Sequence, residues 1–136
     1  MNPHYNQNYT REEIDAVLAK IKDCVNLNRY TIAMNDNRQE NIDFINEYNI
    51  RSEKQKRMLL QLTTDDFCHS LQNRKIGYEY ETLYVFVPQV YLYNAEDAEE
   101  LVDVYMKFNI IELASGVRTV VISFHKCNKP FQYAFR

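Results

Sequence analysis

The chain has 136 residues, 46% of them hydrophobic, with only 2 glycines, 3 prolines and a formal net charge of −3. This size and composition are typical of one globular domain over 1–136 and exclude a disordered or linker-rich chain. The acidic balance argues against a constitutive nucleic-acid-binding protein, but an enzyme needs only a few cations at its site.

The first half of the chain, over 10–74, is predicted to be mainly helical after a polar, flexible start over 1–9. Thr10 and Glu13 have the spacing of a capping box, in which each side chain accepts a backbone N–H at the start of a helix. Apolar residues then recur at helical spacing, which predicts a helix over about 10–25.

Further elements follow in the same half. A short strand is predicted over 30–34, and apolar spacing predicts helices over about 37–49 and 52–61. A fourth, short helix is predicted after a cap at Thr63 or Thr64. Phe67 and Leu71 would be the apolar contacts of that helix, and the basic residues near its end would be His69 and Arg74.

After Gly77 the pattern changes to short runs rich in Tyr, Val and Phe, which predicts an antiparallel sheet over 78–136. The fold class is therefore α+β, with N-terminal helices packed on one face of a C-terminal antiparallel sheet. Strands are predicted within 79–93, broken near Pro88, and over 101–112 and 117–126, joined by a hairpin at 112–117; the tail 131–136 is predicted as an edge strand.

Alternation along the last two strands assigns their side chains to two faces. The apolar face is predicted to hold Val102, Val104, Met106, Phe108, Ile110, Val120, Ile122 and Phe124, and Thr119 and Val121 fall on the opposite face. The helices can cover only one apolar face, so the opposite face presents Tyr105, Lys107, Ser123 and His125. A register with Tyr105 near His125 and Lys107 near Ser123 would gather all four in one patch.

These side chains have the chemical types that metal-free RNA cleavage needs. RNA supplies its own nucleophile, the 2′-hydroxyl, and the reaction needs a base, an acid and positive charge at the phosphate. His125 suits the acid or base role, Lys107 can stabilise the phosphorane, and Tyr105 can donate a hydrogen bond or stack on a base. The alternative interpretation is that these residues form an ordinary solvated polar face of the sheet without a catalytic role.

The sequence carries no pattern for a cofactor or a metal. It has no GxGxxG, P-loop, HExxH or GxSxG motif, and its histidines, His4, His69 and His125, lack metal-site spacing. The 3 cysteines lack CxxC spacing, which fits reduced cytosolic thiols. No apolar run reaches the ~20 residues that span a bilayer, and no signal peptide is recognised. We therefore expect a cytoplasmic protein with no membrane partner and no cofactor.

Three strings in the second half of the chain resemble the MqsR family of bacterial toxins: Leu62–Ser70, Val104–Phe108 and Val120–His125. These toxins are messenger-RNA interferases of type II toxin–antitoxin systems with a RelE-like fold. The resemblance is strongest over about 62–126, and the closing Lys129–Tyr133 looks like versions of the family in Gram-positive bacteria.

The resemblance implies sequence-preferring cleavage of mRNA and neutralisation by a cognate, zinc-containing antitoxin. Tyr105 matches the family's active-site tyrosine in a VYxK strand, and Lys107 belongs to the same motif. His125 and His69 stand where the compact toxins carry lysines, so a group that titrates near neutrality replaces a permanent cation at both positions. Gln89 matches a glutamine implicated in the compact toxins.

Two hypotheses follow. In the first, the chain is a toxin-like endoribonuclease with the catalytic residues His125, Tyr105, Lys107 and His69. Its substrate-binding residues would be Gln89, Ser123, Arg74 and Arg118. In the second, the same fold is a non-catalytic module that binds protein or RNA through the polar sheet face or the sheet edge near 131–135.

Overall fold

The computed structural model describes residues 2–136, and over these residues the chain forms three α-helices and a mixed six-stranded sheet. The helices are α1 (Arg11–Asn26), α2 (Gln39–Glu47) and α3 (Ser52–Leu60), with short 3-10 turns η1 (Asp36–Arg38) and η2 (Thr64–Asp66). The strands are β1 (Tyr30–Ile32), β2 (Phe67–Gln72), β3 (Thr82–Phe86), β4 (Gln89–Tyr93), β5 (Glu99–Leu113) and β6 (Gly116–Lys126). The α+β class is confirmed. Within the described residues, none of these helices is both long and apolar enough to cross a membrane.

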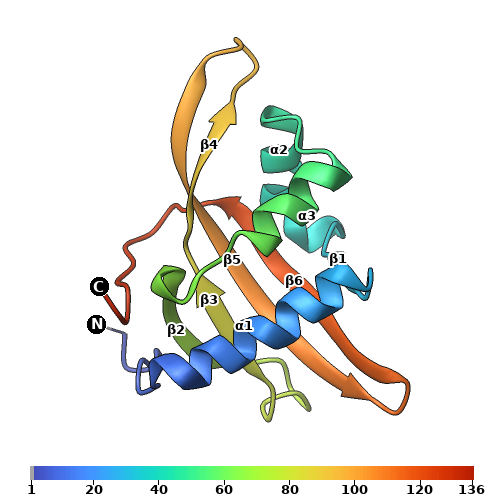
Figure 1. The fold of residues 1–136 in the computed structure, drawn as a ribbon, viewed down its shortest axis with the longest axis vertical. Helices are drawn as coiled ribbons and strands as arrows, with labels where there is room; N and C mark the ends of the chain where they lie inside the picture. Colours follow the sequence, from blue (N-terminus) through green and yellow to red (C-terminus); the bar gives the residue numbers. More distant parts are fainter. Residues whose placement is uncertain (1) are drawn as a thin grey trace.

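The sheet is built around the long β5–β6 hairpin (Figure 1). Its strand order is β1-β6-β5-β3-β2, and β4 pairs with the start of β5. β4 and the facing part of β5 project beyond the rest of the sheet as a two-stranded ribbon. β1 runs parallel to β6, so the sheet is mixed, whereas the sequence predicted a purely antiparallel one.

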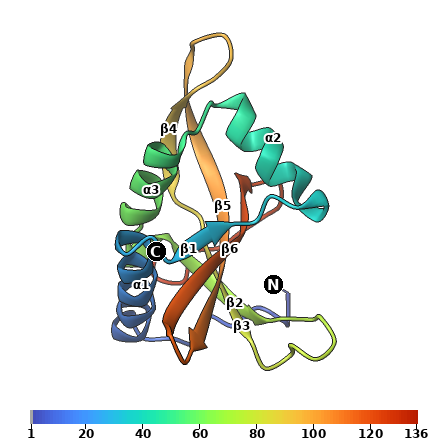
Figure 2. The ribbon, with the colours of Figure 1, turned by 90° about the vertical axis from the view of Figure 1, so that its right-hand side faces the viewer.

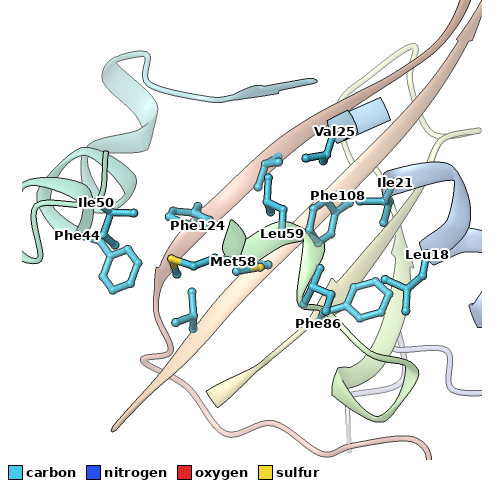
Figure 3. Packing of buried hydrophobic residues seen from close by; sticks show 14 of the residues in the cluster. Leu18, Ile21, Val25, Phe44, Ile50, Met58, Leu59, Phe86, Phe108 and Phe124 are labelled. Atoms are coloured by element: carbon cyan, nitrogen blue, oxygen red, sulfur yellow. The ribbon is translucent and has the colours of Figure 1, made fainter. Parts of the chain in front are cut away.

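The helices pack mainly on one side of the sheet. Figure 2 shows α1 and α3 on one side and the start of the chain on the other. The core between helices and sheet contains Phe108 and Phe124 of the hairpin, in contact with apolar side chains of all three helices (Figure 3). Burying each such side chain stabilises the fold by roughly 1.5–3 kcal/mol.

The local signals at the helix ends act as the sequence predicts. Thr10 accepts the N–H of Glu13 at 3.1 Å while the Glu13 carboxylate accepts the N–H of Thr10 at 2.8 Å, which closes the predicted capping box. Asn28 and Asn49 follow α1 and α2 with positive φ angles of 57° and 47°, a conformation that asparagine tolerates better than most residues. The predicted helices over 10–25, 37–49 and 52–61 are confirmed to within a few residues.

The predicted fourth helix is wrong. Thr63 does form a capping box, with Asp66, but the helix lasts only the turn η2, and Phe67 begins strand β2. Phe67 and Leu71 have helical spacing in the sequence, but in the structure they belong to a strand with a β-bulge between Phe67 and His69. Phe67 therefore joins the helix-side core and Leu71 packs on the opposite face. The antiparallel part of the sheet consequently starts at residue 67 rather than 78.

A second bulge corrects the predicted faces of β6. The register shifts between Lys107 and Phe108, so that Ser123 pairs with Lys107 but Val121 pairs with Phe108. Ile122 is the extra residue, and Val121, rather than Ile122, is buried in the helix-side core. The predicted edge strand over 131–136 is also wrong, because the tail has no strand: Phe131 and Tyr133 pack on the sheet face opposite α1, and Phe135 packs beside Phe67 against the helix-side core.

Candidate active site

A row of residues crosses the sheet on the face opposite α1. His69 of β2 pairs with Val85 of β3, Val85 pairs with Lys107 of β5, and Lys107 pairs with Ser123 of β6. Directly paired residues point to the same face, so the four side chains form one line across four strands. Both bulges border this row. Bulges are over-represented next to active sites, where they re-aim side chains.

Tyr105 and His125 form the next pair along the hairpin, in the register that the sequence predicts. Their rings are stacked, with centroids 5.4 Å apart and an interplanar angle of 20°. Tyr105 and Ser123 are each only 4% exposed, so this face is not an ordinary solvated surface. The hairpin thus brings together the four residues predicted from alternation, and β2 adds His69.

His69 is enclosed by the start of the chain. Its residue is 3% exposed, and the ring of Tyr5 lies parallel to it with centroids 3.6 Å apart. Its Nε2 atom is buried and has no hydrogen-bond partner among residues 2–136. Burial, together with the positive charges of Lys129 and Lys107, lowers the pKa of His69 to about 4. His69 is therefore neutral at pH 7, in contrast to the expectation of a group that titrates near neutrality.

This shift predicts a pH-dependent loss of stability. The pKa of His69 is about 4 in the folded chain against 6.5 when unperturbed, so between these values the unfolded chain binds more protons. Stability is fully present above pH 6.5 and is lost as the pH falls toward 4. We expect this effect of His69 to lower the free energy of unfolding by about 2–3 kcal/mol at pH 4.5 relative to pH 7. The check is urea unfolding at both pH values of the wild type and of His69→Phe, which keeps a ring beside Tyr5. An equal loss of unfolding free energy in the two proteins would refute this role of His69.

Lys107 is half-buried in the middle of the row. Burial lowers its pKa, and the neighbouring cations Arg38 and Lys129 lower it too. Among residues 2–136, no carboxylate lies within ion-pair distance of its ammonium group. A buried cation without a counter-ion is costly to the fold and is therefore suited to meet an anion from outside.

His125 is oriented by its own strand. Its Nδ1 lies 2.9 Å from the carbonyl oxygen of Lys126, and a carbonyl can only accept, so Nδ1 carries the proton of the neutral ring. Nε2 is then left with a lone pair that can accept a proton. The carboxylate of Glu40 is 3.7 Å from Nδ1.

The C-terminal tail contributes residues that the sequence did not identify as part of a site. The Nζ atom of Lys129 lies 4.4 Å from the ring centroid of Tyr105. Phe131 and Tyr133 pack with Tyr105 against the buried Val85 and Val87. Burial raises the pKa of Tyr105, while Lys129 lowers it. No signal in the sequence pointed to Lys129 as a site residue, because its position depends on how an irregular tail crosses the sheet.

The remaining predicted residues divide between the site and other places. Arg74 lines a groove that also contains Lys107. Arg118 pairs with Ile111, four residues along β5 from Lys107, and it does not line that groove. Gln89 lies at the start of β4, where its amide donates to Asp103 at 3.0 Å. Within residues 2–136, no three His, Cys, Asp or Glu side chains gather in a metal-binding group.

No family model and no curated protein matches this chain.

Proposed function

We propose that the chain is a toxin-like endoribonuclease that cleaves mRNA by metal-independent acid/base chemistry. The observation that carries the proposal is the cross-strand row, in which the half-buried cation Lys107 lies between His69 and Ser123, next to the stacked pair of Tyr105 and His125. The reaction needs a base, an acid and positive charge at the phosphate, and His125 and Lys107 on this face are suited to these roles.

Each proposed step uses a group of this face. His125 Nε2 takes the proton of the 2′-hydroxyl, and the 2′-oxygen attacks the adjacent phosphorus. The bond from phosphorus to the 5′-oxygen then breaks, which leaves a 2′,3′-cyclic phosphate and a 5′-hydroxyl. Lys107 stabilises the negative charge of the phosphorane. The lowered pKa of Lys107 also suits it to give a proton to the departing 5′-oxygen.

The other residues position these groups. The ring of Tyr105 holds the His125 ring in place by stacking, and Lys129 beside it adds positive charge near the phosphate. His69 is neutral at pH 7 and acts as a hydrogen-bonding group rather than as a cation. On the resemblance to MqsR toxins, we infer that the substrate is mRNA and that a cognate, zinc-containing antitoxin restrains the enzyme.

A non-catalytic interaction module is the alternative, and a different observation favours it. Tyr91, Tyr93 and Leu101, on the β4–β5 ribbon, are 62%, 54% and 51% exposed. Exposed aromatic and apolar side chains on a projecting ribbon are suited to a protein partner. Induced expression separates the two functions, since a ribonuclease toxin arrests growth and a binding module does not.

The direct test is incubation of the purified protein with a defined single-stranded RNA in EDTA. We expect discrete cleavage products from the RNA and none from the same sequence made as DNA, because DNA lacks the 2′-hydroxyl. Intact RNA in the presence of a folded protein, together with normal growth on expression, would favour the interaction module.

A further inference from the structure

A cationic groove lies beside the row, on its side toward the β2–β3 loop. The groove has a volume of about 450 Å³. Its strand residues are Leu71, Gln72, Leu83, Lys107 and Ile122. Its outer residues come from two segments far apart in the sequence: Arg38 lies between β1 and α2, and Arg74 and Lys75 follow β2.

The charge of the groove is one-sided. Arg38, Arg74, Lys75 and Lys107 line it, and no Asp or Glu among the described residues does so. Within residues 2–136, none of the four cations forms an ion pair. The whole chain has 19 acidic against 16 basic residues, so this concentration of positive charge opposes the average composition. An uncompensated set of cations in a concave surface attracts a polyanion.

The position of the groove indicates which kind of polyanion would bind there. Lys107 belongs to both the groove and the row, so an anion lying along the groove leads directly to Tyr105 and His125. Arg38 and Arg74 offer planar guanidinium groups that bind phosphate through two parallel hydrogen bonds. Because Lys107 is half-buried, the backbone must bend into the groove to bring a phosphate to it. A flexible single strand can bend in this way, whereas a rigid duplex cannot.

We propose that this groove binds the sugar–phosphate backbone of single-stranded RNA on one side of the cleaved bond, through Arg38, Arg74 and Lys75. This inference rests on the proposed function for the nature of the substrate. It adds a binding path and gives a role to Arg38, which the sequence did not single out.

The test measures binding without cleavage. A short, fluorescently labelled single-stranded RNA with every 2′-hydroxyl methylated cannot be cleaved, and its affinity is measured at several salt concentrations. We expect Arg38→Gln, Arg74→Gln and Lys75→Gln each to reduce the slope of log affinity against log salt by about 0.7, and the triple variant by about 2. Arg51→Gln, at the exposed start of α3, is the matched control and should keep the wild-type slope.

Three results would overturn the inference: wild-type slopes in all groove variants, equal affinity for the duplex of the same sequence, or equal competition by polyglutamate of the same charge. The last would indicate an acidic protein segment as the occupant. The outcome is separable from the proposed function. Loss of slope with no cleavage of ordinary RNA would leave an RNA-binding groove without an enzyme, and cleavage with unchanged slopes would leave an enzyme that does not use this groove.

Discussion

Replacing Lys107 by Met is expected to lower the rate of RNA cleavage by about 10²–10³-fold without weakening the fold, on the scale measured for removing one stabilising group of a charged transition state. The loss follows from the position of Lys107 in the middle of the row, where it is the cation nearest to both Ser123 and Val85 in the strand register. The fold is spared because Met keeps the apolar stem and removes a half-buried charge that has no carboxylate partner within residues 2–136.

Single-turnover cleavage and urea unfolding, measured on the same preparation, check both halves of this expectation. Lys107→Arg is the companion variant, because it retains a positive charge at the phosphate but its guanidinium does not give up a proton. It should keep more activity than Lys107→Met. A Lys107→Met protein that cleaves at the wild-type rate would remove Lys107 from the mechanism. An unfolded variant would instead make Lys107 a structural residue.

His125→Ala is expected to reduce cleavage by about 10²–10⁴-fold, the usual range for loss of a general base. The carbonyl of Lys126 holds Nδ1 protonated, so Nε2 is the atom that accepts a proton from the 2′-hydroxyl. The His125 ring also stacks on Tyr105, so His125→Ala removes this stacking contact as well as the base.

His125→Phe separates these roles because it keeps a ring against Tyr105 and removes the base. Both variants should be equally slow if His125 acts as a base, and the rate of His125→Ala should rise when imidazole is added. Recovery of activity in His125→Phe alone would show that stacking, rather than proton transfer, is the contribution of this residue.

The β5–β6 hairpin is the part of the site that the sequence predicts best. Alternation along two long strands and a short turn is enough to pair Tyr105 with His125 and Lys107 with Ser123, and the structure has both pairs. The sequence does not reveal the bulge at Ile122, because one extra residue leaves no trace in composition. The predicted faces were therefore exchanged for Val121 and Ile122, and also for Thr119 and Val120, which pair with Ile110 and Asn109.

Residues contributed by other segments were harder to predict. His69 was expected near the end of a helix, because Phe67 and Leu71 have helical spacing and the bulge between Phe67 and His69 has no signature of its own. Arg38 and Lys129 reach the site through the 3-10 turn η1 and an irregular tail, whose positions depend on tertiary packing rather than on local pattern.

The most direct test of the proposed chemistry is the identity of the RNA ends produced in EDTA, determined by mass spectrometry. The mechanism predicts a 2′,3′-cyclic phosphate on one fragment and a 5′-hydroxyl on the other. It also predicts that a single 2′-deoxy substitution at the cleaved nucleotide stops cleavage there. Fragments ending in a 3′-hydroxyl and a 5′-phosphate, or cleavage that continues at the 2′-deoxy position, would contradict a site that uses the RNA's own 2′-hydroxyl.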